Sequence, residues 1–452
     1  MFRGSRSWRG AAGALAVMAI VSACGSPAVT ATPKATATPT PVPTAAPTPA
    51  AGLFVDAGSD QGPISPLVYG TNYGPSISFP PELEPQVEAA GLKTLTFPGG
   101  NWGDENDVTT DQIDTFVAYC KKLGAEPRIV VRLKNGTAQA AADLVKYANV
   151  TMGYGVKYWA IGNETDLYDA NGMVGYAVDQ YNTDYRSFAL AMKAVDPKIK
   201  LIGPDVSQFA ASASDSYMQA RVAWLSSFLK ADGDLVDMVS IHRYPFPIDT
   251  QTPPTADDLR VGGREWDQSI PALRALIKEQ TGKDLPVAVT ETNSSWADNA
   301  GTDGSMDSHM NAIWFADVLG TLINQKVDMV DQFALAGDWG IVGRSKVNPI
   351  YYAYIMFQHF GTRLLRSASD DQLVRVYAAK RSDGTVTIMI VNLGAAAATR
   401  PLTVIGGGAS TAAETWLFDA SHSAEKVAAT AISAGGAVTV PGESVTVLVL
   451  GK

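Results

Sequence analysis

The sequence predicts an α/β protein in which a (β/α)8 TIM barrel precedes a C-terminal antiparallel β-sandwich. Over residues 67–361, eight short apolar segments alternate with amphipathic segments of helical length, as is typical of a closed barrel. After Gly361 the apolar segments are separated only by Gly, Asp and Ser turns, and no segment of helical period intervenes. This change predicts a sandwich over residues 362–452. An open, doubly wound sheet with extra strands is the alternative for the first region.

The predicted elements follow in chain order. Barrel strands are predicted at 68–72, 93–97, 128–132, 158–161, 200–203, 238–242, 287–290 and 330–335. The intervening helices are predicted near 81–91, 110–123, 137–152, 174–195, 216–231, 268–281, 305–325 and 349–359. Sandwich strands are predicted at 373–377, 385–391, 402–405, 414–418 and 444–450. Residues 53–66, which contain a short strand and a turn-rich connector, are predicted to join the sandwich, so that it holds the barrel from both of its ends.

Residues 1–24 resemble an export signal. Three arginines precede an apolar stretch at 11–21 that is short for a membrane span. The segment that ends at Cys24 resembles the lipobox of bacterial lipoproteins, whose cysteine is lipidated and becomes the first mature residue. A plain signal peptide is the alternative. We therefore predict an exported lipoprotein, on the bacterial cell surface or facing the periplasm, that meets the membrane only through its lipid anchor.

Residues 25–52 form a predicted linker. They are mostly Pro, Thr and Ala with almost no charge, and such a tract cannot bury a core. If Cys24 carries lipid, Cys120 is the only other cysteine, so no internal disulfide is predicted.

The composition excludes one class of partner. With 46% apolar and 18% charged residues, the chain is typical of a globular protein with a sizeable core. Its formal net charge of −10 leaves no basic block to meet phosphates, so we expect no nucleic-acid partner. The sequence does not predict an oligomeric state.

Polar and aromatic side chains follow nearly every predicted barrel strand. Because barrel enzymes build their sites from the loops at the carboxyl ends of the strands, we expect these side chains to share one rim. A purely structural barrel has no reason to collect them there. They include Asn72, Asn101, Trp102, Asn163, Glu164, His242, Tyr244, Glu291, Asn293, Trp296 and Trp339.

Two of these residues are glutamates at the ends of apolar strands. Glu164 ends the segment Lys157-Tyr-Trp-Ala-Ile-Gly-Asn-Glu164, and Glu291 ends a similar one. Two such glutamates on two parallel strands are what an enzyme that works with a pair of carboxylates requires. A single Gly-Asn-Glu triplet occurs readily by chance, but a second glutamate in the same strand context favours a catalytic pair.

The order of these motifs resembles clan A of the retaining glycoside hydrolases. Gly-Asn-Glu after the fourth strand and a Glu after the seventh are the motifs that carry the resemblance. It implies that Glu164 is the general acid/base, that Glu291 is the nucleophile, and that Asn163 binds the substrate's 2-hydroxyl. Ile241-His-Arg-Tyr244 resembles the clan's His and Tyr, so His242 and Tyr244 are implied to line the site and contact the nucleophile.

Two further segments resemble particular families. Residues 64–72 and Phe97-Pro-Gly-Gly-Asn101 are similar to segments of family 51, the arabinofuranosidase type, and of family 44, the endoglucanases. The layout of barrel and sandwich is also similar to families 39, 30 and 79. Relatives often carry an arginine where this chain has Thr96, so another cation, from Arg132 or Lys134, is expected to replace it, or the nucleophile is tuned differently.

The resemblance implies a retaining hydrolase of poly- or oligosaccharides. An α-L-arabinofuranosidase, a β-xylosidase, a β-glucuronidase and an endoglucanase all remain open. A sugar-binding surface lipoprotein that lost catalysis is the alternative from another class, and the two retained glutamates argue against it.

The predicted chemistry sets geometric expectations. Partial burial and its neighbour's charge should keep Glu164 protonated, while hydrogen bonds, for example from Tyr244, keep Glu291 ionised. The two carboxyls are expected about 5–5.5 Å apart, the retaining geometry. Trp102, Trp296 and Trp339 offer flat faces for sugar rings, with core packing as the alternative. The other histidines show no ligand spacing, so neither a metal nor another cofactor is predicted.

Overall fold

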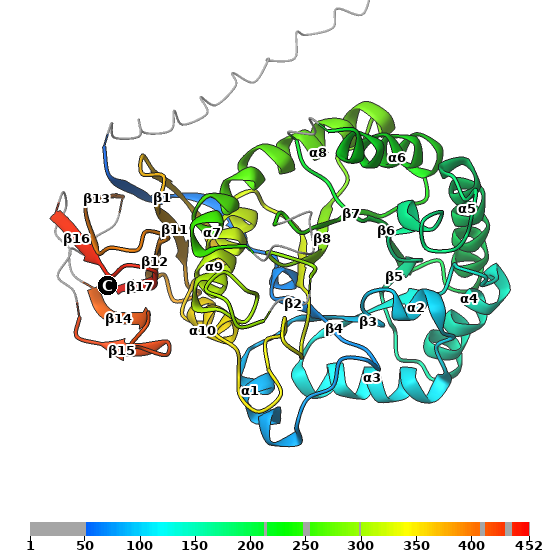
Figure 1. Cartoon of the computed structure of the whole chain (residues 1–452), viewed down its shortest axis with the longest axis horizontal. Coiled ribbons are helices and arrows are strands. Elements are labelled where there is room, and N and C mark those ends of the chain that lie inside the picture. Colours follow the sequence, from blue (N-terminus) through cyan, green and yellow to red (C-terminus); the bar gives the residue numbers. More distant parts are fainter. Residues whose placement is uncertain are drawn as a thin grey trace, which may run out of the picture. The chain divides into compact units, whose positions relative to one another are not determined.

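The computed structural model describes residues 51–211, 215–246, 254–297, 300–406, 412–429 and 436–451. The predicted signal segment with Cys24, and the predicted linker up to residue 50, lie outside these residues. In the described ranges no helix combines the length and the apolar character that crossing a membrane requires. The chain forms a closed barrel of eight strands and a second sheet of nine strands (Figure 1), which confirms the predicted fold class.

The barrel strands are parallel, neighbours in the chain are neighbours in the barrel, and the last strand pairs with the first. Each predicted barrel strand is present. The strands are β2 (Gly70–Asn72), β3 (Thr94–Phe97), β4 (Glu126–Val131), β5 (Tyr158–Ile161), β6 (Lys200–Val206), β7 (Met238–Arg243), β8 (Val287–Thr292) and β9 (Met329–Gln332). Their carboxyl ends share one rim because all eight run in the same direction.

Helices surround the barrel. They are α1 (Glu84–Ala89), α2 (Trp102–Glu105), α3 (Thr110–Leu123), α4 (Ala138–Val145), α5 (Val178–Val195), α6 (Ser216–Asp232), α7 (Ala256–Gly262), α8 (Trp266–Thr281), α9 (His309–Asn324) and α10 (Ile350–Gln358). Shorter helical turns are η1 (Pro66–Val68), η2 (Pro81–Leu83), η3 (Lys146–Thr151), η4 (Thr165–Leu167) and η5 (Gly263–Glu265). Local signals set the ends of α3, which starts with a Thr109–Gln112 capping box and stops at Gly124 with a left-handed φ of 66°.

The second sheet has the order β15-β14-β17-β12-β11-β10-β1-β13-β16. Its strands are β1 (Leu53–Pro63), β10 (Arg363–Ser369), β11 (Val374–Lys380), β12 (Val386–Asn392), β13 (Ala398–Ile405), β14 (Ala412–Phe418), β15 (Glu425–Val427), β16 (Gly436–Val440) and β17 (Ser444–Leu450). β1 lies between β10 and β13, and it is antiparallel to β10 but parallel to β13. The sheet is therefore not wholly antiparallel as predicted, because β1 arrives from before the barrel instead of through a hairpin.

The two faces of the nine-stranded sheet bury different cores. In β11, Val376 and Ala378 belong to a core that joins the strands of this sheet, including β1 and β16. Their neighbours Tyr377 and Ala379 belong to the main core, together with the barrel and its helices. Successive side chains of a strand point to opposite faces of the sheet, so β11 contributes to both cores. The face that carries Tyr377 and Ala379 packs the sheet against the barrel.

Helix α9 lies between the barrel and the second sheet. All fourteen residues from Met310 to Ile323 are buried. A helix that is buried on every side has no solvent face, and most of the buried residues of α9 are apolar. It packs against β11, β12 and β17, while α10 packs against β14 and β17.

Candidate active site

Glu164 directly follows β5, in a turn that depends on the glycine before it. A Cβ on Gly162 would lie 2.8 Å from Thr165 Cγ2 and 2.9 Å from the Tyr168 hydroxyl oxygen, and Gly162 has a φ of +75°. Glu164 itself has a φ of 45°, a conformation that costs free energy in any residue other than glycine. Its backbone N–H donates to the carbonyl of Asp205 at 3.2 Å, which holds the turn against β6.

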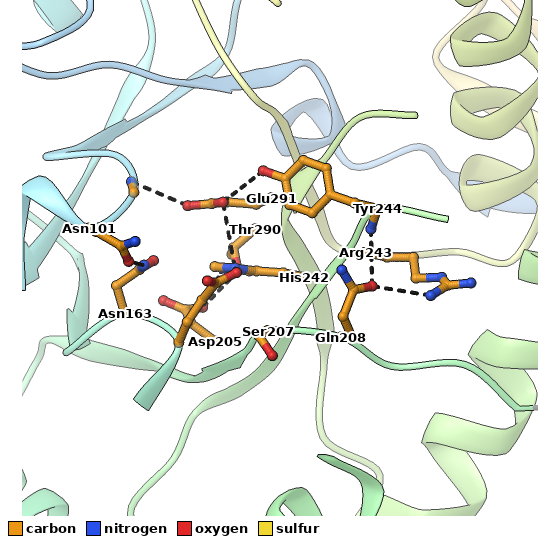
Figure 2. A network of polar contacts seen from close by, with 12 residues as sticks. Asn101, Asn163, Asp205, Ser207, Gln208, His242, Arg243, Tyr244, Thr290 and Glu291 are labelled. Atoms are coloured by element: carbon orange, nitrogen blue, oxygen red, sulfur yellow. Dashed lines mark hydrogen bonds and ion pairs between the residues drawn. The ribbon is translucent and has the colours of Figure 1, made fainter. Parts of the chain in front are cut away.

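Glu291 lies in β8 and is 6% exposed. Its Oε1 accepts a hydrogen bond from the backbone N–H of Gly100 at 3.2 Å, and its Oε2 accepts one from the Tyr244 hydroxyl at 2.8 Å. Figure 2 shows the carboxylate between these two donors and the ring of His242. The loop that carries Gly100, the end of β7 that carries His242 and Tyr244, and β8 itself therefore meet at this carboxylate.

His242 joins the two glutamates. Its Nδ1 lies 3.0 Å from Glu164 Oε1 and 3.6 Å from Glu291 Oε2. One donor atom from each of the three side chains lies within 4.8 Å of the other two. One carboxyl oxygen of Glu164 and one of Glu291 thus lie within 4.8 Å of each other, which is nearer than the roughly 6.5–9.5 Å between the carboxyls of inverting enzymes.

Burial and neighbouring charges have opposite effects on the pKa values of Glu164, His242 and Glu291. Burial raises the pKa of Glu164 above its usual value, and it raises the pKa of Glu291 to about 7. Burial also disfavours a charged His242, but the carboxylate of Glu291 and the contact with Glu164 outweigh it and raise the pKa of His242 to about 9. Burial therefore works against an ionised Glu291, although its hydrogen bonds favour one.

A buried ion pair lies beneath His242. The Arg128 guanidinium in β4 contacts the carboxylate of Asp205, and both side chains are 2% exposed. Asp205 Oδ1 also accepts a hydrogen bond from Thr290 Oγ1 at 2.7 Å and lies 4.0 Å from His242 Nε2. Burial alone would raise the pKa of Asp205, but Arg128 and His242 hold it below its usual value. The carboxylate in turn stabilises a protonated His242.

Arg128 is also the cation beside Thr96. Its Nη1 donates to Thr96 Oγ1 at 3.2 Å. The two cations expected from the sequence lie elsewhere: Arg132 binds the carbonyls of Asp104 and Lys134. The Lys134 ammonium donates to the carbonyl of Asn171 at 2.6 Å. A cation therefore does lie beside Thr96, but it is neither Arg132 nor Lys134. Arg128 belongs to the buried part of β4, whereas Arg132 and Lys134 follow the end of that strand.

A cavity of about 540 Å³ opens above the two carboxyls, and Glu164 and Glu291 line it. Five predicted substrate-binding residues also line it: Asn101, Asn163, Tyr244, Trp296 and Trp339. Asn163 Nδ2 donates to Asn101 Oδ1 at 3.0 Å, so the two amides orient each other. Trp296 is 48% exposed at the cavity, which is unusual for a large apolar ring.

Four other predicted residues do not reach the cavity wall, and His242, which contacts the two glutamates, is one of them. Asn72 is 1% exposed and donates to the carbonyl of Thr290, so it ties β2 to β8. Asn293 is fully buried, and its amide donates to the carbonyls of Phe333 and Trp339. Trp102 is half-buried and packs against the main core. The sequence placed these residues after strands, but it did not indicate which way they point.

The cavity includes residues that the sequence analysis missed. They are Leu167, Asn171, Ser207, Gln208, Tyr217, Met218 and Phe333, whereas Gly100 and Arg243, which also line the cavity, lie in segments that the sequence had singled out. Ser207 and Gln208 directly follow β6, so a search for polar side chains after every barrel strand would have found them. Tyr217 and Met218 lie in the first turn of α6, and no feature of the sequence indicated that this helix starts at the cavity.

The trio of Glu164, His242 and Glu291 also offers three possible metal ligands within 4.8 Å of one another. An imidazolium has no lone pair for a metal. Because the pKa of His242 is about 9, a cation would have to displace its proton at neutral pH.

Comparisons with known proteins support a glycosidase relationship. Residues 144–340 match the family model described as glycosyl hydrolases family 39. The intracellular exo-α-(1→5)-L-arabinofuranosidase of Streptomyces lividans is 26% identical over 204 residues, which cover 36% of this chain and 29% of that protein. The chain spans 29–39% of the length of this and three further curated relatives.

Solved structures share the whole fold. An α-L-arabinofuranosidase from Thermotoga maritima aligns with a TM-score of 0.70 and 20% identity, covering 88% of this chain and 99% of that one. A family 44 xyloglucanase from Paenibacillus polymyxa aligns with a TM-score of 0.69 and 17% identity, covering 88% and 99%. The predicted resemblance to clan A glycoside hydrolases is confirmed by the family 39 match together with these neighbours.

The comparisons correct the predicted location. The relatives from Streptomyces lividans, Bacillus subtilis, Halalkalibacterium halodurans and Acetivibrio thermocellus are all named intracellular arabinofuranosidases. The prediction of an exported surface or periplasm-facing lipoprotein is therefore contradicted. It depended on a charged and apolar segment that ends at Cys24, and such a pattern also occurs in segments that are not export signals.

Proposed function

We propose that the protein is a retaining glycoside hydrolase, with residues 67–361 as its catalytic domain and residues 53–66 and 362–452 as its second domain. One observation carries the proposal: Glu164 and Glu291, on strands far apart in the sequence, bring their carboxyls together at the floor of one cavity, with His242 between them. The match to family 39 and the curated arabinofuranosidases support this activity.

The proposed roles of the glutamates follow from their hydrogen bonds. Two buried carboxyls this close ionise together only at high cost, so at working pH the pair holds one proton. Within the described ranges, the Glu291 carboxyl accepts hydrogen bonds from two donors, Gly100 N–H and the Tyr244 hydroxyl, whereas the hydrogen bond found for the Glu164 carboxyl is the one with His242. The proton therefore resides on Glu164, and Glu291 is the anion.

The reaction is then a double displacement. Glu291 attacks the anomeric carbon and forms a glycosyl ester, while Glu164 protonates the departing glycosidic oxygen. Glu164, now a carboxylate, takes a proton from water, and the water oxygen displaces Glu291 from the anomeric carbon with net retention. Asn163 contributes an amide at the cavity wall beside Glu164, where a sugar hydroxyl can bind.

We favour an α-L-arabinofuranoside as the sugar that is released. The curated relatives carry that name, and so does a structural neighbour that covers nearly the whole fold. Trp339 and Phe333, beside Glu291 in the cavity, supply apolar surface for the ring.

The test is a panel of aryl glycosides that includes the α-L-arabinofuranoside, the β-xyloside, the β-glucuronide and a β-glucan fragment. We expect turnover of the arabinofuranoside and a loss of about 10⁴-fold or more in kcat for Glu291→Gly, because the covalent step is lost. Added azide should restore turnover of Glu291→Gly by attacking the anomeric carbon as the aryl alcohol leaves with the proton of Glu164. The product should be a glycosyl azide of inverted configuration.

Two outcomes would reject the proposal. A Glu291→Gly protein with full activity would remove the nucleophile assignment. A wild-type protein that binds these sugars, by calorimetry, without turning over any of them would support a sugar-binding protein instead. Asn72→Ala is not a suitable control since it is buried, but exposed Leu190→Ala on α5 is one, and it should match the wild type.

A further inference from the structure

The cavity has two unlike walls. One wall, beside Glu291, is built by the loops after β3 and β9 and includes Gly100 and Trp339. The other follows β5 and β6 and includes Leu167, Gln208 and Tyr217. Because Glu164 lies in the turn that follows β5, it stands at the edge of this second wall. An acid that protonates the leaving oxygen must face the leaving group, so the second wall lies on the leaving-group side.

Tyr217 is the exposed aromatic ring of that wall. It lies in the first turn of α6 and is 40% exposed. The Arg221 guanidinium lies 3.7 Å from the centre of the ring and covers one of its faces. A ring that is held from behind and open in front loses little conformational freedom when a ligand stacks on it.

The support for Tyr217 extends back to the cavity wall. Arg221 Nε lies 3.3 Å from Oδ2 of Asp166, which is 2% exposed. Asp166 in turn accepts hydrogen bonds from the backbone N–H of Ser207 at 2.9 Å and from its hydroxyl at 2.5 Å. Tyr217 and Ser207, both in the wall, are thus braced by one buried ion pair. Burying such a pair is expensive for stability alone, which favours a positioning role.

Gln208 supplies a free hydrogen-bond donor beside this ring. Its Oε1 accepts from the Arg243 guanidinium at 3.1 Å and from the backbone N–H of Tyr244 at 3.2 Å. These bonds fix which way the amide faces, and Figure 2 shows Nε2 turned away from Arg243. Gln208 is only 9% exposed, and the hydrogen bonds found for its amide among the described residues are the two that Oε1 accepts. A nearly buried donor without a partner is ready for a ligand acceptor.

The charges of this wall determine the class of ligand. Arg221 is paired with Asp166, and Arg243 makes a two-pronged ion pair with Glu265 at 2.8 and 2.6 Å. Neither cation is left to neutralise an anionic ligand. The wall therefore suits a neutral, hydroxyl-bearing ring that offers one apolar face to Tyr217, and it does not suit a uronic acid.

We propose that Tyr217 and Gln208 form a sugar-binding subsite for the leaving group, so that the enzyme prefers substrates in which a neutral sugar ring is released. The Tyr217 ring stacks against the apolar face of that sugar, and Gln208 Nε2 donates to one of its hydroxyls. This inference rests on the proposed hydrolase function, since only a cleavage reaction has a leaving group.

The test compares two substrates that share the sugar cleaved best by the wild type. In one, this sugar is linked to a second neutral sugar; in the other, it is a methyl glycoside, which has no leaving ring. We expect Tyr217→Ala to lower the ratio of kcat/KM for the disaccharide to that for the methyl glycoside about tenfold, mainly through KM. Tyr217→Phe keeps the ring and should keep the wild-type ratio.

Arg221→Met removes the support behind the ring without touching the substrate. It should lower the same ratio by a smaller factor, about threefold, whereas Leu190→Ala on the outer face of α5 should leave it unchanged. An equal loss on both substrates in Tyr217→Ala, or no loss on either, would overturn the subsite. A wild-type protein that cleaves none of the aryl glycosides of the panel would instead reject the hydrolase function, so the two failures are distinguishable.

Discussion

His242 is the residue on which the chemistry of the site depends most. It contacts both glutamates through Nδ1, and its other nitrogen faces Asp205. With a pKa of about 9, it is an imidazolium at neutral pH, and this charge partly offsets the burial of the two carboxyls. Asp205, held by Arg128, keeps that charge in place.

This arrangement predicts the pH dependence of a His242→Asn variant. Removing a cation makes each neighbouring carboxyl harder to ionise, so the pKa values of both Glu164 and Glu291 rise. Activity needs Glu291 ionised and Glu164 protonated, so both limbs of the kcat/KM profile should move to higher pH, by about one unit.

The profile is measured on an aryl glycoside from pH 4 to pH 10. His359→Asn is the matched control, because that histidine stacks on Trp416 in the second sheet and should leave the limbs unmoved. Limbs that stay at their wild-type positions in His242→Asn, whatever the loss of rate, would contradict the assigned role.

At the scale of elements, the contact of α9 with β11 joins the barrel to the second sheet. Gly320 in α9 has no room for a side chain, since an added Cβ would lie 2.5 Å from the Tyr377 ring of β11. The Tyr377 hydroxyl donates to the carboxylate of Asp317 at 2.6 Å, also in α9. The ring is therefore fixed at both ends and cannot move aside.

Gly320→Ala should accordingly destabilise the protein by about 1–3 kcal/mol, although alanine is the better helix former. Urea unfolding measures the change. The penalty should shrink in a Tyr377→Leu background, where the ring is gone, and the double-mutant cycle isolates the contact. A Gly320→Ala protein as stable as the wild type would show that the two elements separate easily.

The regular elements were predictable where the pattern was periodic. All eight barrel strands are short apolar runs between polar turns, and each is found. Strands β10, β15 and β16 were missed. β10 reads Arg-Leu-Leu-Arg-Ser-Ala-Ser, which has no alternation, and it is a strand because β1 and β11 pair with its two edges. Such partners lie far away in the sequence, so local pattern cannot reveal them.

The residues of the site likewise divide into those that the sequence could predict and those that it could not. The two glutamates, His242 and Tyr244 were predictable because each ends a strand of one barrel. Arg128 left a signal that was not used, a charge in the buried part of an otherwise apolar strand. Tyr217 left none, because a helix start faces the cavity only through the path of the loop before it.

At the scale of the whole molecule, several carboxyl groups are buried and have raised pKa values. Burial raises the pKa of Asp104, Asp331 and Glu291 each to about 7. The folded protein therefore holds more protons than the unfolded chain between about pH 4 and pH 7. His242, with a pKa of about 9, extends the same effect upward from about pH 6.5. The stabilisation that each of these groups contributes to the folded state is complete below its window and is lost as the pH rises through that window.

The melting temperature should consequently fall by several degrees from pH 5 to pH 9, as calorimetry can measure. Asp331→Asn is the informative variant, because Oδ1 of Asp331 is buried without a hydrogen-bond partner and Oδ2 accepts from Thr96 at 2.7 Å. The amide keeps an acceptor and removes the charge, so the fall with pH should be shallower. A melting temperature that rises from pH 5 to pH 9 would contradict the assigned buried acids.

Strand β1 gives the molecule a particular order of assembly. During synthesis on a ribosome, β1 emerges before any strand of the barrel, but its partners β10 and β13 are made only after the whole barrel. Asp60 and Arg363, which form an ion pair between β1 and β10, are 303 positions apart. The nascent chain must carry β1 with both of its edges unpaired while the barrel is made. Only when β10 and β13 have left the ribosome can the two ends of the chain be tied together.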